Sequence, residues 1–74
     1  MGSNNRKPAL KTLIEALVEE MLDGSILLDE ATEELERVFI TKALERNQSH
    51  ISKTASKIGI HRNTLSKKLN EYKS

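Results

Sequence analysis

The side chains best suited to recognise a ligand lie together near the C-terminus of this 74-residue chain. Arg62 has a planar guanidinium that can pair with O6 and N7 of guanine or clamp a phosphate. Asn63 can bridge N6 and N7 of adenine. Thr64 and Ser66 are short enough to reach a phosphate or a base edge, and Lys67 is a point charge suited to phosphate. These residue types, so close together, favour contact with double-stranded nucleic acid.

The spacing around these residues predicts two short helices joined by a sharp turn. Ala55 falls where two helices cross closely, and Gly59 falls where the chain must reverse. A helix-turn-helix of this kind can place the start of its second helix in the major groove. The alternative stays open, because many helical domains with a glycine turn never touch DNA. The expected shared core of the two helices consists of Ile58, Ile60 and Leu65.

The distribution of charge favours the DNA-binding interpretation. Residues 1–47 contain six Lys/Arg and ten Asp/Glu, a net charge of −4, whereas residues 48–74 contain six and one, a net charge of +5. A protein with one basic end is suited to an anionic partner at that end. In the last helix Leu65, Leu69 and Tyr72 form an apolar stripe, and roughly opposite lie Asn63, Ser66, Lys67 and Asn70.

Composition limits the remaining possibilities. A chain of 74 residues forms one domain at most, and it buries too little surface to be comfortably stable alone. There is no cysteine, which excludes disulfides and thiolate metal sites. No apolar run approaches the ~20 residues of a membrane span, and no secretory signal is visible. Residues 1–8 are expected to be a disordered tail or a cloning scar.

Catalytic and metal chemistry find no support in the sequence. His50 and His61 have no cysteine or paired carboxylate near them, and a metal site needs three or four converging ligands. No glycine-rich phosphate loop is present. We therefore expect no enzyme activity, no metal, no cofactor and no small-molecule substrate.

The N-terminal part of the chain predicts two longer helices. The first begins near Pro8 and ends before Gly24, which we expect to be the left-handed residue that terminates it. The second begins near Asp29 as N-cap and ends at about Arg46, and Ser49 or His50 lies near the N-cap of the third. The first helix carries a wide apolar stripe of Leu10, Leu13, Ile14, Leu17, Val18, Met21 and Leu22.

The second helix is more apolar than a helix with one buried side requires. One of its stripes can pack on the C-terminal helix pair, and another remains for the first helix or for a second copy of the chain. Pairing of two such hairpins would give a dimeric four-helix bundle. The alternative is that both stripes are satisfied within one monomer. The expected dimer interface consists of Leu10, Leu13, Ile14, Leu17, Met21, Leu35 and Phe39.

The run Gly59–Leu69 closely resembles the helix-turn-helix of the Fis family, and Leu35–Leu44 looks like the preceding helix of that family. The likeness extends over about residues 9–72 and is strongest to the C-terminal DNA-binding domains of NtrC-type, sigma-54-dependent activators. The resemblance implies an all-α fold in which residues 9–46 dimerise and residues 50–72 form the helix-turn-helix. It also implies a homodimer that bends DNA in the nucleoid of the bacterial cytoplasm.

The resemblance further implies individual contacts to DNA. The positions that correspond to groove and phosphate contacts of the family are His61, Arg62, Thr64, Ser66 and Lys67. Those that correspond to phosphate contacts at the start of the third helix are His50, Ser52 and Lys53. This chain departs from the family pattern there, since many members have Gly-Asn in place of Ser49-His50 and a polar residue in place of Ile51.

Three functions are consistent with the sequence. The first is a dimeric, sequence-specific DNA-binding domain of an NtrC-type activator whose upstream parts are missing from this chain. The second is a free-standing, Fis-like protein that bends DNA, which the near-neutral net charge of +1 disfavours. The third is a helical dimerisation module that does not bind DNA.

Overall fold

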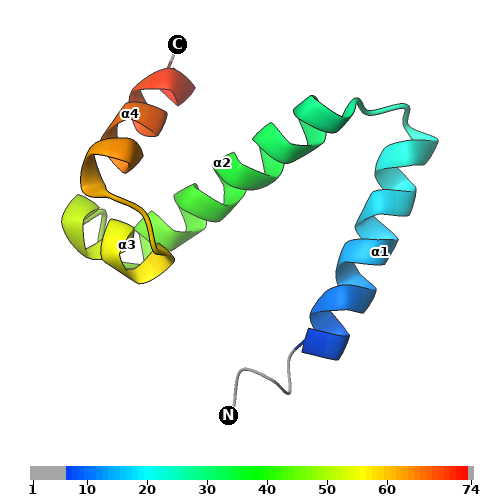
Figure 1. The fold of residues 1–74 in the computed structure, drawn as a ribbon, viewed down its shortest axis with the longest axis horizontal. Coiled ribbons are helices and arrows are strands. Elements are labelled where there is room, and N and C mark those ends of the chain that lie inside the picture. Colours follow the sequence, from blue (N-terminus) through cyan, green and yellow to red (C-terminus); the bar gives the residue numbers. More distant parts are fainter. Residues whose placement is uncertain (1–6, 74) are drawn as a thin grey trace. The chain divides into compact units, whose positions relative to one another are not determined.

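The computed structural model describes residues 7–73, and within them the chain is all-α, as predicted. Four helices follow one another, α1 (Lys7–Asp23), α2 (Leu28–Arg46), α3 (Ile51–Ile58) and α4 (Arg62–Lys73) (Figure 1). The chain divides within α2 into two compact units, one up to Thr32 and the other from Glu33 onwards. Residues 1–6 of the predicted tail lie outside the described residues, and helix α1 already begins at Lys7.

In the turn after α1, the left-handed residue lies one position later than predicted. The prediction that Gly24 adopts the left-handed conformation is wrong, since that conformation belongs to Ser25, with φ 59°. The Ser25 amide donates to the Leu22 carbonyl at 3.0 Å, and the Ile26 amide donates to the Met21 carbonyl at 2.9 Å. These two bonds close the end of the helix in a Schellman arrangement and therefore place the reversal at Ser25.

The start of α2 also differs from its prediction. Asp29 is the second residue of the helix, so its assignment as N-cap is wrong. Glu30 in the first turn accepts a hydrogen bond from the Leu27 amide at 3.0 Å. A side chain that reaches back in this way satisfies a donor at the helix end, as the second half of a capping box does. The helix can therefore begin at Leu28 without a capping side chain from Asp29.

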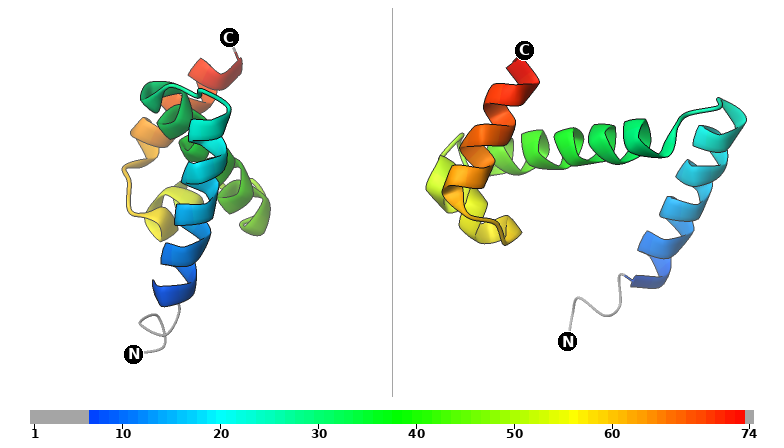
Figure 2. Two further views of the ribbon diagram at one scale, coloured as in Figure 1. Left: turned by 90° about the vertical axis from the view of Figure 1, so that its right-hand side faces the viewer. Right: turned by 45° about the horizontal axis from the view of Figure 1, so that its top comes forward.

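The second unit is built around a small apolar core to which three helices contribute. Ile40 of α2, Ala55 of α3 and Leu65 of α4 are 3%, 1% and 0% exposed. The right-hand view of Figure 2 shows α3 and α4 beside the C-terminal end of α2, where the shared core lies. The side chains packed around this core include four predicted ones, Ile58, Ile60, Leu69 and Tyr72, and also Leu44 and Ile51. The sequence therefore identified the central residues of the helix-turn-helix correctly.

Hydrogen bonds fix the two turns of the second unit. Gly59 has φ 83°, and its amide and the Ile60 amide both donate to the Ala55 carbonyl, at 2.9 and 3.0 Å. This is the tight, left-handed turn that the sequence predicted at Gly59. Thr54 is fully buried, and its hydroxyl donates to the His50 carbonyl at 2.7 Å. Buried Asn47 donates from its side-chain amide to the Ala43 carbonyl at 2.8 Å, so both buried polar side chains are satisfied.

A polar cluster ties the C-terminal half of α4 to α2. The Glu36 carboxylate accepts hydrogen bonds from Lys68 Nζ at 3.0 Å and from the Tyr72 hydroxyl at 3.2 Å. The bond from Lys68 is the main cause that lowers the pKa of Glu36 below its usual value of 4.5. Burial, together with the bond to Glu36, raises the pKa of Tyr72. Sequence patterns do not predict this cluster, because Glu36 lies 32 and 36 positions before its two partners.

Each unit also carries large apolar side chains that remain exposed. In the first unit α1 exposes an apolar stripe, in which Leu13 is 67% and Leu17 is 43% exposed, while Met21 is half-buried. In the second unit α2 exposes Leu35, Val38 and Phe39, the last at 58%. The remaining exposed apolar side chains of the first unit are Leu10, Ile14, Val18, Leu22, Ile26, Leu27 and Leu28.

The two inter-helix glycines should respond in opposite ways to alanine. Gly59→Ala should lower the free energy of unfolding by about 1 kcal/mol, because a Cβ at positive φ is strained even where space is open. Gly24→Ala should leave stability unchanged or raise it by about 0.4–1 kcal/mol, because its Cβ would meet only ordinary contacts. Urea unfolding followed by circular dichroism measures both. A larger loss for Gly24→Ala would contradict the turn geometry.

The Glu36 cluster should be sensitive to acid. A carboxyl whose pKa is lowered in the folded state adds stability above its unfolded pKa, and this stability is lost as the pH falls through the folded pKa. Wild type should therefore melt at a higher temperature than Glu36→Gln at pH 6, and the two melting temperatures should converge as the pH falls below 4. Thermal melts from pH 3 to pH 7 measure the difference. A difference that stays constant with pH would show that the ionised carboxylate is not responsible.

Candidate nucleic-acid interface

The beginnings of α3 and α4 are where the structure places most of the predicted DNA-contacting residues. At the start of α3, Ser52 and Lys53 are exposed in the first turn. At the start of α4, Arg62, Asn63 and Thr64 form an exposed first turn. The two helices share the core around Ala55 and Leu65 and are joined by the Gly59 turn. The relative positions of the two helix ends are therefore determined by packed and hydrogen-bonded residues rather than by a free loop.

Each of these helix ends is capped by a histidine. His50 precedes α3 in an extended conformation, and its Nδ1 accepts a hydrogen bond from the Lys53 amide at 3.2 Å. His61 precedes α4, and its Nδ1 accepts from the Asn63 amide at 3.1 Å. Of the two residues considered for the α3 cap, His50 and not Ser49 supplies it. The resemblance implied a DNA contact for His61, and the structure adds that this side chain also accepts a hydrogen bond at the start of α4.

The charge on this surface is free to meet an anion. Among the described residues, ion pairs join Arg37 to Glu34 and Lys68 to Glu36. Arg62 and Lys67 take part in neither pair, and both side chains are exposed. The same holds for Lys53 of α3. Binding a phosphate here would therefore not require an existing ion pair to be broken.

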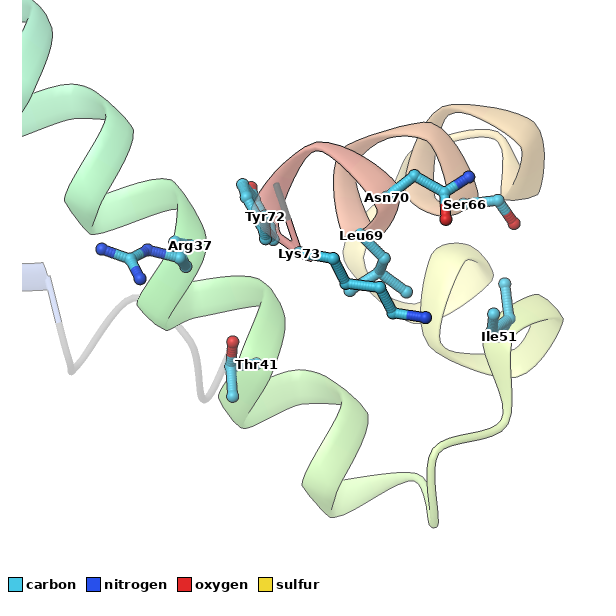
Figure 3. A pocket seen from close by; sticks show the side chains of 8 residues that line it. All are labelled: Arg37, Thr41, Ile51, Ser66, Leu69, Asn70, Tyr72 and Lys73. Atoms are coloured by element: carbon cyan, nitrogen blue, oxygen red, sulfur yellow. The ribbon is translucent and has the colours of Figure 1, made fainter.

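Ser66 lies differently from its predicted partners. It is half-buried and lines a groove of about 560 Å³ between α2 and α4, together with Leu69 and Asn70 (Figure 3). Ser66 is thus nearer to the apolar side of α4 than the helical pattern suggested, while Lys67 is exposed. The remaining residues that line the groove are Arg37, Thr41, Ile51, Tyr72 and Lys73.

The part of the chain that the structure describes has neither a metal-binding cluster nor a membrane-spanning helix. No group of three or more His, Asp or Glu side chains is placed to hold a metal ion there. None of the described helices is both long and apolar enough to cross a bilayer.

Comparison with known proteins relates this surface to transcription regulators. Residues 31–72 match the model of the family described as bacterial regulatory protein, Fis family. The hydrogenase transcriptional regulatory protein HoxA of Bradyrhizobium diazoefficiens is 43% identical over 51 residues, which cover 69% of this chain and 10% of that protein. The DNA-binding transcriptional regulators NtrC of Escherichia coli and Salmonella typhimurium are each 49% identical over 45 residues. Those 45 residues cover 61% of this chain and 10% of each regulator.

No solved structure shows a significant match to the chain. The chain spans about a tenth of the length of these relatives. The family match covers more than half of the chain, from Ala31 in α2 through α3 to Tyr72 in α4. It thus includes the whole packed core of Ile40, Ala55 and Leu65. On this evidence the chain belongs to the Fis family of bacterial regulatory proteins.

Proposed function

We propose that this chain is the DNA-binding part of a bacterial, NtrC-type, sigma-54-dependent transcription activator, and that it binds a specific DNA sequence as a homodimer. The observation that carries the proposal is the exposed, polar first turn of α4, held on a packed core with Arg62 and Lys67 outside any ion pair. The printed functions of the relatives support it, since NtrC is a DNA-binding transcriptional regulator and HoxA a transcriptional regulatory protein.

In this proposal the residues divide into base-reading and backbone-contacting groups. Arg62 and Asn63 lie at the start of the recognition helix α4, where side chains of a helix-turn-helix face base edges. Lys67 lies one and a half turns further along, where the helix approaches the sugar-phosphate backbone. Ser52 and Lys53 contact phosphates from α3, and Thr64 and Ser66 contribute short hydrogen-bonding groups from α4. The bound DNA is bent, and the protein acts in the bacterial cytoplasm.

The homodimer is supported by the exposed apolar side chains of both units. In the second unit, Leu35, Val38 and Phe39 of α2 line a groove of about 580 Å³. Burying a side chain of this size contributes about 1.5–3 kcal/mol of favourable free energy relative to leaving it in water. A second copy of the chain that covers these side chains and the α1 stripe would recover that free energy. The proposed interface consists of Leu10, Leu13, Ile14, Leu17, Met21, Leu35 and Phe39.

The dimer is tested by a charge placed in the α1 stripe. Leu17→Asp should cost several kcal/mol of dimer stability, because the interface would bury an unpaired carboxylate. Thr12→Asp adds the same charge on the opposite side of α1 and serves as the control. Sedimentation equilibrium should show a dimer for wild type and the control, and a monomer or an unfolded chain for Leu17→Asp. A wild-type chain that is a folded monomer at tens of micromolar would exclude the proposed dimer.

DNA binding and the division of roles are tested by two α4 variants on a selected site and on a scrambled one. Arg62→Ala should cost about 1–3 kcal/mol per half-site on the selected sequence and relax the choice of base there. Lys67→Ala should weaken binding to both sequences alike and reduce the salt slope by about one unit per subunit.

Fluorescence anisotropy at several salt concentrations gives affinity, preference and slope together. Preference that survives Arg62→Ala and disappears with Lys67→Ala would reverse the two assignments. Absence of any wild-type binding at low salt would leave the dimerisation module as the function.

A further inference from the structure

The groove of about 580 Å³ in the second unit combines apolar side chains with three cations. Lys42 and Arg46 lie one turn apart on α2, Lys57 lies in the last turn of α3, and all three line the groove and are exposed. Among the described residues neither ion pair includes any of them, and no acidic residue lines the groove. The apolar side chains of this α2–α3 groove are Leu35, Val38, Phe39, Ala43 and Ile58.

This combination specifies the chemistry of what can cover the α2–α3 groove. A cation that leaves water needs a negative charge in its place, so the partner must be acidic. The exposed side chains of Leu35, Val38 and Phe39 need apolar surface as well. The backbone of DNA supplies negative charge but little apolar surface. An amphipathic helix with carboxylates beside its apolar stripe supplies both.

Helix α1 has this pattern. Its apolar stripe is exposed, and every charged residue after Lys11 is acidic. Glu15 is three positions from Val18, and Glu20 is three positions from Leu17, so each carboxylate is a neighbour of the stripe on the helix surface. They lie on opposite sides of it. Neither of the ion pairs among the described residues involves α1.

We propose that the α2–α3 groove receives α1 of a second copy of the chain, with its cations paired to Glu15 and Glu20 of the partner subunit. The inference rests on the proposed homodimer and adds where the partner's α1 lies and what orients it. Twofold symmetry repeats the contact in the dimer. Complementary charges of this kind determine orientation and choice of partner more than affinity. Because Lys57 and Ile58 belong to α3, the contact also joins the helix-turn-helix directly to the dimer.

Reversing the charge on either side tests the contact. The groove-reversed variant carries Lys42→Glu and Lys57→Glu, and the α1-reversed variant carries Glu15→Lys and Glu20→Lys. Like charges would then face each other in each homodimer, so its Kd should rise about 10- to 100-fold at low salt. Two controls make the same charge changes elsewhere and should keep the wild-type Kd. They are Lys53→Glu with Lys67→Glu, and Glu19→Lys with Asp23→Lys on the side of α1 away from the stripe.

An equimolar mixture of the two reversed variants identifies which chain supplies α1. In a heterodimer the acidic groove of one chain faces the basic α1 of the other, and the basic groove of the second chain faces the acidic α1 of the first. Sedimentation equilibrium should therefore show a dimer in the mixture at a concentration at which each variant alone is monomeric. This recovery would also show that both variants can fold.

The outcomes separate this contact from the rest of the proposed function. Reversed variants that dimerise as tightly as wild type would overturn the contact and leave the homodimer intact. Monomeric variants that stay monomeric when mixed would overturn it too, because α1 of another chain would then not be the occupant. A groove-reversed variant that keeps the dimer but binds DNA more weakly would assign the cations to phosphates instead.

Failures of the wild-type chain are equally distinct. A folded wild-type monomer at tens of micromolar would exclude the proposed homodimer and this contact together. A mixture that recovers the dimer, from a chain that does not bind DNA, would support the contact and overturn the DNA-binding function alone.

Discussion

The close crossing of α3 and α4 at Ala55 is the constraint on which the rest of the second unit depends. Ala55 is 1% exposed and shares its core with Leu65, which is fully buried, and with Ile40 of α2. A larger side chain at Ala55 would separate the helices, since packed cores accept extra volume poorly. The relative positions of the starts of α3 and α4 depend on this crossing, because both helices pack on the same core. In the proposed function, the small side chain of Ala55 would therefore position the DNA-contacting residues without contacting DNA itself.

Because that core is small, interactions outside it must contribute to the stability of the chain. Within the described residues, the fully buried apolar core is limited to Ile40, Ala55 and Leu65. Stability must therefore draw on hydrogen-bonded turns, on the Glu36 cluster and, in our proposal, on apolar burial against a second copy. Binding of a partner to the folded chain stabilises it by mass action. Folding and dimerisation of such a domain would be linked, so its stability would rise with the concentration of the protein.

The sequence predicted the features that depend on local spacing. Ala55, Gly59 and Leu65 have the positions that a helix-turn-helix requires, and all three have the predicted roles. The predictions at Gly24 and Asp29 failed, because a helix end is decided by which amide reaches which carbonyl or carboxylate, and Ser25 and Glu30 met those needs instead. The Glu36 cluster could not be predicted, because it joins residues that only the folded chain brings together. The cap at His50 was one of two alternatives that the sequence predicted for the third helix, and the structure decides between them.

The central claim is that the starts of α3 and α4 together form the surface that meets DNA, and amide chemical-shift mapping tests it most directly. A nitrogen-15-labelled chain would be titrated with a duplex that carries its selected site. The account predicts the largest shifts at residues 50–53 and 61–64, with small shifts along the exposed apolar side of α2 at Leu35, Val38 and Phe39. Shifts concentrated on that side of α2, with the starts of α3 and α4 unchanged, would contradict it.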